Sequence, residues 1–343
     1  MSVIKDVTIV SLSKGILGES FVRHEVDIGV ERLKKMGLNV RFSRHCLSGL
    51  DFIAKHPEAR AQDLLDAFNS DTDMILCAIG GDDTYKLLPF LFGHDELKNA
   101  VSDKVFLGFS DTTVNHLMLH KVGLNTFYGQ SFLADVCELS PSMLPYTESY
   151  FTELIETGTV KRITPSGVWY DSREDFGPEA VGTCLPEHIN SGFELLQGAP
   201  VFTGKVLGGC IDTLYDLFNN ERYSDSVELC ERYGLFPTLD DWKGRILLLE
   251  TSEEQPAPEK YRLMLRALKS TGVFSAVSGV LIGKPYNENH FREYKRILVE
   301  EIALPSLPIV TNINVGHALP RCIIPFGTEA KVDVGKQEIS FIA

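Results

Sequence analysis

Two hydrophobic patterns alternate along the first 120 residues of the chain. Short, almost wholly apolar runs predict buried strands, and segments with apolar residues at three- and four-residue steps predict amphipathic helices. Continuous apolar strands alternating with such helices are typical of a parallel sheet covered on both faces. The predicted strands are 7–12, 39–42, 74–79 and 105–109, and the predicted helices are 19–36, 57–69, 84–92 and 111–121.

A second unit with similar alternation follows a break. Glycine and proline are frequent between residues 160 and 200, which predicts a connector with irregular or short β structure. The 343 residues suit two domains. We therefore expect an α/β protein with an N-terminal domain over 1–160, a connector over 161–203 and a C-terminal β/α domain over 204–343. The predicted strands of the second unit are 204–207, 245–250, 279–282, 309–312, 330–334 and 338–342, and its helices are 211–219, 258–271 and 290–302.

Charge and composition exclude several classes of partner. The chain carries 33 Lys and Arg against 47 Asp and Glu, a net charge of −14 that disfavours nucleic acid polymers and anionic membrane surfaces. No apolar run approaches the ~20 residues of a membrane helix, and the start lacks the pattern of a signal peptide. We expect a cytoplasmic protein. Its seven cysteines form no Cys-x-x-Cys pair, so we expect them to bind no metal.

The first candidate for chemistry is a serine at a strand-to-helix bend. The buried run at 105–109 leads directly into Ser110 and Asp111, and a predicted helix follows. This is the layout of a nucleophile elbow, although Thr112 stands where that motif has its second glycine. The amides of a helix start also suit a developing oxyanion. The alternative is that Ser110 or Asp111 only caps the helix.

Two further candidates lie at or after the ends of other predicted strands. Glu250 ends the apolar run 246–249, where sites form at the edge of α/β sheets, and could orient a histidine. His317 stands between Gly316 and the proline at 320, in a constrained loop. A solvated glutamate and an ordinary surface histidine are the alternatives.

The fourth candidate for chemistry is a glycine pair at 80–81. Paired glycines after a strand can present amides to an anion, and the run 80–84 is reminiscent of the phosphate loop of NAD-kinase-like and phosphofructokinase-like enzymes. A carboxylate at Asp83 would repel a phosphate. His116 and His120 share a helix face but lack the glutamate of a zinc hydrolase motif. Trp169 is either a core residue or a platform for a flat ligand.

Taken together, these motifs resemble the LD-carboxypeptidase family of serine peptidases, which includes murein tetrapeptide carboxypeptidases and microcin C7 immunity proteins. The order of serine, glutamate and histidine is that of the family, and the resemblance covers nearly the whole chain. The length and the long connector with Trp169 are closer to the microcin immunity branch. The motifs that carry the resemblance are Gly80-Gly81-Asp82, Gly108-Phe109-Ser110-Asp111, Gly204-Lys205-Val206-Leu207-Gly208-Gly209, Leu249-Glu250-Thr251, Gly279 to Lys284 and Gly316-His317-Ala318-Leu319-Pro320.

The resemblance implies a flavodoxin-like N-terminal domain and a role for each motif. Ser110 would be the nucleophile, His317 the general base and acid, and Glu250 the residue that orients His317. Backbone amides of Gly81 and Asp111 would form the oxyanion hole.

The resemblance also implies a substrate, and it implies a homodimer without metal or organic cofactor. In the immunity branch, a tryptophan in the region of Trp169 stacks on the base of an aminoacyl-nucleotide, and Asp82 would lie near the same substrate. Cys210 replaces the asparagine usual in that branch, and Asp82-Asp83 departs from its glycine-loop pattern. Arg262 could meet a substrate carboxylate or lie on a helix surface.

The sequence thus predicts a serine carboxypeptidase or amidase that acts on a small molecule or short peptide. Its substrate would be an LD-peptide or an aminoacyl-nucleotide amide, with a murein tetrapeptide as the alternative. Two other classes stay open, namely a nucleotide kinase that uses the 80–84 loop and a non-catalytic protein that sequesters a ligand.

Overall fold

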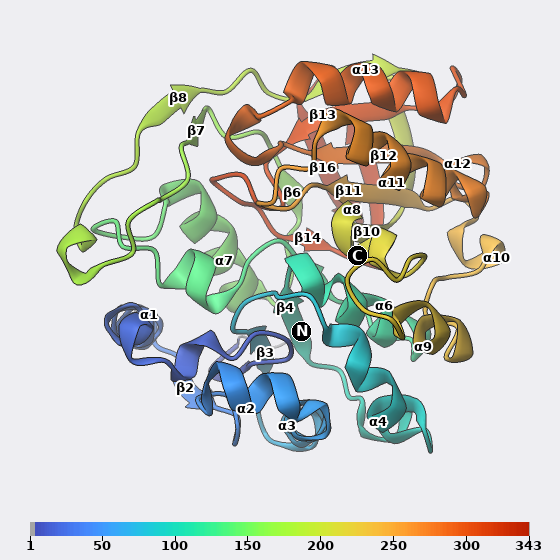
Figure 1. Ribbon diagram of the computed structural model, residues 1–343. Coiled ribbons are helices and arrows are strands. Elements are labelled where there is room, and N and C mark those ends of the chain that lie inside the picture. Colours follow the sequence, from blue (N-terminus) through green and yellow to red (C-terminus); the bar gives the residue numbers. More distant parts are fainter. Residues whose placement is uncertain (1–3, 343) are drawn as a thin grey trace.

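The computed structural model describes residues 4–342. The lower half of the molecule in Figure 1 is built on a mainly parallel sheet. Within these residues, six strands lie in the order β14-β5-β4-β3-β1-β2. β1 to β5 run parallel, whereas β14 pairs antiparallel with β5. The order of the parallel strands is that of flavodoxin-like folds. The bounds are β1 (Asp6–Val10), β2 (Asn39–Phe42), β3 (Met74–Cys77), β4 (Val105–Gly108), β5 (Phe127–Tyr128) and β14 (Ile324–Pro325).

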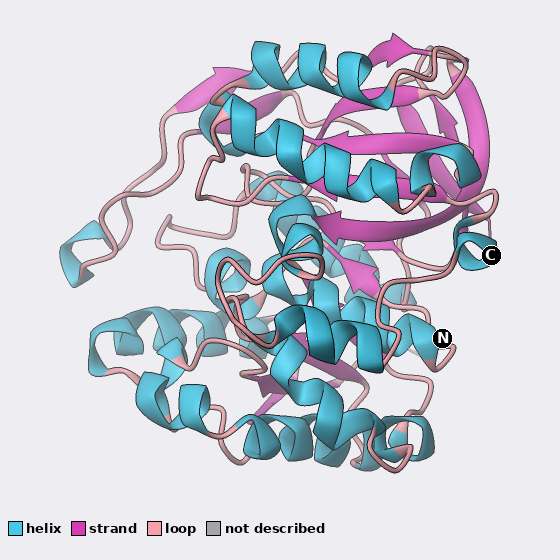
Figure 2. Ribbon diagram, turned by 45° about the vertical axis from the view of Figure 1, so that its right-hand side comes forward, coloured by secondary structure: helices cyan, strands magenta, loops and turns pink. Residues whose placement is uncertain are grey.

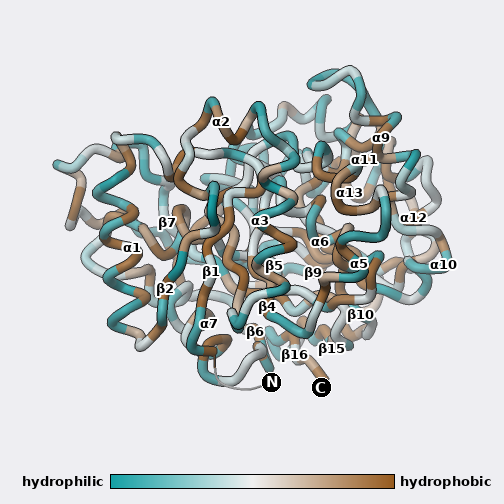
Figure 3. The backbone as a smooth tube through the Cα atoms, turned by 90° about the horizontal axis from the view of Figure 1, so that it is seen from below, coloured by the Kyte–Doolittle hydropathy of each residue, from teal (hydrophilic) through white to brown (hydrophobic). Residues whose placement is uncertain are grey.

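Helices cover both faces of this sheet, as the apolar runs predicted. Every residue of β3 and β4 is buried. α3 starts at Pro57, whose fixed φ suits the first helical turn, and α1 alternates between brown and teal around its axis (Figure 3). The helices are α1 (Arg23–Lys35), α2 (Gly49–Lys55), α3 (Pro57–Asn69), α4 (Leu88–Phe92), α5 (Glu96–Ala100), α6 (Thr113–Lys121) and α7 (Pro145–Thr157), with the short turns η1 (Ile16–Gly18), η2 (Ser20–Val22), η3 (Thr84–Leu87), η4 (Ser110–Thr112) and η5 (Phe132–Val136).

A second sheet fills the upper half of the molecule (Figure 2). Among the described residues its order is β6-β16-β15-β10-β11-β12-β13-β9. β10 to β13 are parallel, and antiparallel strands flank them. The bounds are β6 (Arg162–Ile163), β9 (Glu194–Gln197), β10 (Val201–Cys210), β11 (Ile246–Glu250), β12 (Gly279–Gly283), β13 (Ile309–Ile313), β15 (Glu329–Asp333) and β16 (Glu338–Ile342).

The long helices α11 and α13 pack against each other. They bury an apolar face that includes Tyr261 and Leu265 of α11 and Ile297 and Leu298 of α13. None of the helices within residues 4–342 has the length and apolar character needed to cross a bilayer. The helices of this half are α8 (Ile211–Asp216), α9 (Ser226–Arg232), α10 (Leu239–Trp242), α11 (Pro258–Ser270), α12 (Val273–Ala276) and α13 (Phe291–Ile302), with the turn η7 (Tyr286–Glu288).

The connector contains short β structure, as the glycine and proline pattern predicted. β7 (Val168–Tyr170) and β8 (Glu187–Ile189) form an antiparallel hairpin that includes the turn η6 (Pro178–Ala180) and extends to the left in Figure 1. β6 and β9 join the second sheet, whereas β14, from the C-terminal part, joins the first. The chain therefore passes between the two sheets several times, and the exact domain boundaries stay a prediction.

Candidate active site

Three side chains from separate strand ends meet between the two sheets. Ser110 follows β4 of the first sheet, Glu250 ends β11 of the second, and His317 follows β13. His317 Nε2 lies 3.0 Å from Ser110 Oγ, and its Nδ1 lies 2.7 Å from Glu250 Oε2. This is the geometry of a Ser-His-carboxylate triad. The three motifs singled out in the sequence are thus brought into hydrogen-bond contact.

Ser110 stands at a sharp bend with an unusual backbone conformation. Its φ is +66°, in the left-handed region, where the chain passes from extended Phe109 into the turn η4, of which Ser110 is the first residue. A non-glycine residue in this region costs free energy, and such strain is a feature of nucleophile elbows. The bend directs Oγ toward His317 and places the start of a helical segment directly after the serine.

Tyr128, at the end of β5, joins two members of the constellation. Its hydroxyl donates to Glu250 Oε1 at 2.7 Å and accepts from the backbone N–H of Ser110 at 3.1 Å. Burial raises the pKa of Tyr128 well above its usual range, so the hydroxyl keeps its proton and remains a donor. Tyr128 was not among the residues predicted from the sequence, because β5 has only two residues and gives little hydrophobic pattern.

The loop that carries His317 is fixed by glycine and arginine. Gly316 has a φ of +92°, and a side-chain carbon there would collide with the Glu250 carboxylate. The Arg321 guanidinium donates to the carbonyl oxygens of Gly316 and His317 and pairs with Asp135 at 2.9 Å. These contacts hold the imidazole in place.

The protonation of His317 reflects two opposing influences. Burial favours the neutral imidazole, but the nearby carboxylates of Glu250 and Glu253 outweigh burial and raise the pKa of His317 to about 10. Glu253 Oε2 lies 3.0 Å from Nε2.

The glycine pair lies against the serine bend. A side-chain carbon at Gly80 would stand 2.6 Å from Ser110 Cβ and 3.1 Å from the Asp111 nitrogen, so only glycine allows this approach. Gly81 has a φ of +156° and abuts Ser13. The two loops expected to form the oxyanion hole, at Gly81 and Asp111, are therefore adjacent, and the hole itself stays a prediction.

The side chain of Asp111 ties these loops together. It accepts hydrogen bonds from Ser13 Oγ at 2.7 Å, Thr84 Oγ1 at 2.6 Å and the Thr84 amide at 3.0 Å. Burial raises the pKa of Asp111, and the three donors oppose that effect. Asp83 turns to the buried Arg60, with Oδ1 2.5 Å from Nη1. The Asp83 carboxylate thus forms a buried ion pair beneath the glycine loop.

A cavity of about 1360 Å³ opens beside the triad. Asp82 lines it and contacts Tyr223 at 2.9 Å and Arg222 at 3.2 Å. Phe176 also lines it and is 54% exposed. Other lining residues are Ile16, Phe21, Lys86, Leu133, Glu253 and Tyr286.

Trp169 lies elsewhere and does not line this cavity. It is 9% exposed, stacks on His188 at 4.2 Å between ring centroids, and has Lys284 Nζ 5.1 Å from its ring centre. The structure therefore places Trp169 within its hairpin. The stacking of Trp169 on a substrate base stays a prediction, and no contact in the structure supports it.

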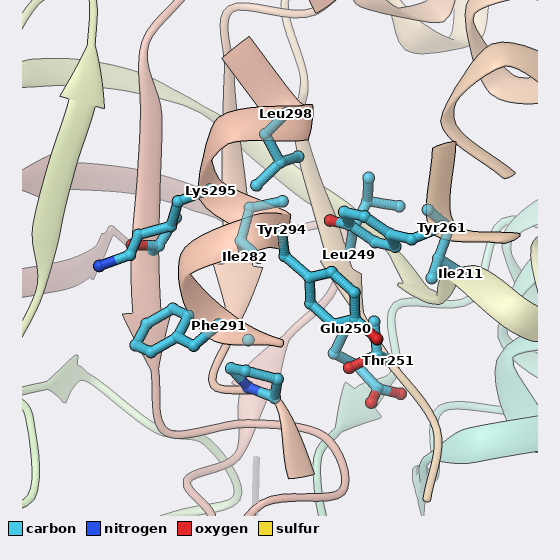
Figure 4. Close-up of a pocket in the computed structure, with 13 residues that line it drawn as sticks. Ile211, Leu249, Glu250, Thr251, Tyr261, Ile282, Phe291, Tyr294, Lys295 and Leu298 are labelled. Carbon is cyan, nitrogen blue, oxygen red and sulfur yellow. The ribbon is translucent and has the colours of Figure 1, made fainter. Parts of the chain in front are cut away.

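A second, much smaller space is lined in part by Glu250 (Figure 4). Its volume is about 10 Å³, and apolar and aromatic side chains such as Tyr261, Tyr294 and Leu298 surround it. A space of this size holds at most one water molecule. It belongs to the packing of α11 and α13 on the sheet and offers no room for a substrate.

Other candidate residues have structural partners. His116 is buried, contacts Thr126 Oγ1 at 2.7 Å and has its pKa lowered to about 3 by burial, so it is neutral and serves packing. Arg262 forms ion pairs with Glu300 and Glu301 on the helix surface, which leaves it no role at the cavity.

One group of metal-ligating side chains occurs in the part of the chain that the structure describes. Cys210 Sγ lies close to the Glu250 and His317 side chains, with one atom of each within 4.8 Å of the others. Hydrogen bonds to Asp212, Tyr128 and Ser110 already account for these three residues. The prediction that the protein uses no metal or organic cofactor remains untested.

Comparison with known proteins places the chain in a family. The model of the LD-carboxypeptidase N-terminal domain matches residues 7–129, and that of the C-terminal domain matches residues 203–332. The chain is 25% identical to the microcin C7 self-immunity protein MccF of Escherichia coli, covering 91% of this chain and 86% of MccF. It is 27% identical to a putative carboxypeptidase of Treponema pallidum, over 90% of this chain and 85% of that protein.

Among solved structures, an MccF-like protein from Streptococcus pneumoniae in complex with AMP is 59% identical, with a TM-score of 0.98 and coverage of 99% of both chains. The two domain matches span most of the chain in the expected order. The protein therefore belongs to the LD-carboxypeptidase family, and the predicted family and two-unit α/β fold are confirmed.

Proposed function

We propose that the protein is a serine hydrolase that cleaves an amide bond by acyl transfer. The observation that carries this proposal is the contact of His317 with Ser110 on one side and with Glu250 on the other. In a neutral imidazole, Glu250 accepts the Nδ1–H and leaves the Nε2 lone pair directed at the serine hydroxyl. That arrangement is what a serine nucleophile needs for activation.

The reaction then proceeds in two halves. Ser110 Oγ attacks the substrate carbonyl while His317 Nε2 takes the hydroxyl proton. The oxyanion of the tetrahedral intermediate accepts hydrogen bonds from the amides of Gly81 and Asp111. Nε2 then gives its proton to the leaving nitrogen, and the acyl group stays on Ser110. A water molecule, activated by the same nitrogen, releases the acyl group as a carboxylate.

As substrate we propose an aminoacyl-nucleotide amide, as in detoxification of a microcin C7-type compound. AMP is bound by the Streptococcus pneumoniae relative at 59% identity. The cavity beside Ser110 is large enough for a nucleotide together with an acyl group. Phe176 and Phe21 expose aromatic rings in this cavity, and such rings suit a base. A murein LD-tetrapeptide is the alternative, which the family itself supports.

Paired substrates test both parts of this proposal. The wild-type protein should hydrolyse an aminoacyl adenosine phosphoramidate faster than a murein LD-tetrapeptide, measured by product release. Ser110→Ala should reduce kcat by ~10⁴–10⁶-fold on the preferred substrate. Turnover by Ser110→Ala at the wild-type rate would refute the triad, whereas a preference for the tetrapeptide would reassign the substrate.

The two other classes make opposite predictions. A nucleotide kinase on the 80–84 loop would need a divalent cation, so hydrolysis that survives EDTA argues against it. A sequestering protein would bind without turnover and leave Ser110 unlabelled by a fluorophosphonate. From the family resemblance we also propose that the protein is cytoplasmic and forms a homodimer. Sedimentation analysis tests the homodimer.

A further inference from the structure

The catalytic nitrogen of His317 has two oxygen neighbours in this structure. Ser110 Oγ and Glu253 Oε2 each lie 3.0 Å from Nε2. On the other side of the ring, Glu250 Oε2 lies 2.7 Å from Nδ1. A neutral imidazole carries one N–H, and only the protonated ring offers a hydrogen at both nitrogens. Carboxylates at both nitrogens therefore favour the imidazolium.

The other charged groups around the ring do not cancel this effect. Asp212 adds a further carboxyl group near the ring, and Arg321 directs its guanidinium to the carbonyl oxygens of the histidine loop. Lys14 lies on the side of Glu253. Burial raises the pKa of the Cys210 thiol, which keeps the thiol neutral. The contact with His317 in turn lowers the pKa of Glu253 to about 2, so this carboxylate is charged at neutral pH.

Glu250 and Glu253 are held very differently. The Glu250 side chain is fully buried and takes a hydrogen bond from Tyr128, so it stays in place during the reaction. The Glu253 side chain is 61% exposed, lies in the loop between β11 and α11, and faces the cavity. Its contact with His317 is therefore one that an incoming ligand can break.

Resting on the proposed function, we propose that Glu253 is a positioning residue that holds His317 protonated in the free protein and withdraws when substrate binds. A protonated Nε2 cannot accept the Ser110 proton, so the free protein has an inactive serine. Ser110 Oγ and Glu253 Oε2 touch the same nitrogen, so they are at most twice 3.0 Å apart. A leaving group on the carbon that Oγ attacks would occupy the space of the carboxylate. Substrate binding thus displaces Glu253 and frees the base.

The test compares wild type with Glu253→Gln and with a control, Glu259→Gln. Glu259 is an exposed glutamate in the first turn of α11, outside the cavity, so the control removes the same charge without touching His317. The rate of labelling by a small fluorophosphonate is measured from pH 5 to 10. The ring signals of His317 are followed by NMR over the same range, without substrate.

Labelling should rise with pH as His317 loses its proton. In Glu253→Gln this rise and the NMR titration should move to lower pH by about one unit, which makes labelling at pH 7 about tenfold faster. Glu259→Gln should follow wild type. An unmoved His317 titration or an unmoved labelling profile in Glu253→Gln overturns the assignment. If no protein is labelled at any pH, the proposed serine chemistry fails, and the His317 titration still decides whether Glu253 controls the proton.

Discussion

Two groups of residues around the large cavity differ in how their side chains are held. Around Ser110, the imidazole of His317 and the carboxylate of Glu250 are buried, and hydrogen bonds connect residues of both sheets. In the second group, Phe21 of η2 and Phe176 before η6 are more than half exposed. A contact of His24 Nε2 with the Phe176 carbonyl oxygen at 3.0 Å links these two segments.

Under the proposed function, this difference separates the residues of the chemical step from those of substrate recognition. Acyl transfer needs atoms held to a fraction of an ångström, since a misplacement of about 1 Å can cost a hundredfold in rate. Recognition of a flat or apolar group tolerates looser placement, because such contacts depend on area more than on direction. Substitutions in the group around Ser110 should therefore change kcat, and substitutions in the exposed aromatic group should change KM.

The largest effect is expected for Gly316→Ala. The added carbon would collide with Glu250 and displace the carboxylate that orients His317, so kcat should fall about 10²-fold or more. Gly37→Ala is a matched control, because Gly37 has a similar φ of +84° with nothing within 4 Å of the added carbon. It should lose some thermal stability and keep kcat. A wild-type kcat in Gly316→Ala would show that the loop tolerates displacement.

A smaller effect is expected for Tyr128→Phe. The variant keeps the aromatic ring but leaves Glu250 Oε1 and the Ser110 amide without their hydroxyl partner. Loss of one hydrogen bond to a charged group should lower kcat about tenfold with little change in KM. Tyr146→Phe removes a hydroxyl that donates to the Thr164 carbonyl, away from the triad, and should leave kcat unchanged. Equal kcat in the two variants would refute the role of Tyr128.

The smallest effect is expected for Phe176→Ala. Removing one exposed ring from the cavity should raise KM for the nucleotide substrate about threefold to tenfold and leave kcat within twofold. Leu263→Ala, at an exposed apolar position of α11 outside the cavity, serves as the control. A fall in kcat without a change in KM would contradict the separate roles of the two groups of residues.

Local pattern predicted most of the regular structure but missed several short elements. The apolar runs at β3, β4 and β11 and the periodic faces of α3 and α11 carry strong signals, because burial on one or both sides fixes their residue types. The short helices α2, α9, α10 and α12 have four to seven residues each and too little periodicity to stand out. The helix α7, with thirteen residues, was missed despite a proline at its start.

The site residues likewise fall into those that the sequence predicted and those that it did not. Ser110, Glu250 and His317 could be picked out because each follows or ends a strand in a distinctive local sequence. The side chains of Tyr128, Asp111 and Glu253 contact partners that lie 27 to 122 residues away in the sequence. No local pattern encodes such a contact. The family resemblance indicated Trp169 as the platform for a base, whereas in the structure Phe176 lines the cavity and Trp169 does not.

By itself, the sequence determined the family, the α/β class and the three strand-end residues, because periodicity and turn chemistry are local properties that survive without the fold. Only the tertiary structure decided that Asp83 pairs with Arg60, that Trp169 stacks within its own hairpin, and that Glu253 reaches His317. Each of these contacts joins residues that lie apart in the sequence, so it exists only once the chain has folded. The distances between such side chains, and the charges that they carry, therefore depend on the tertiary structure.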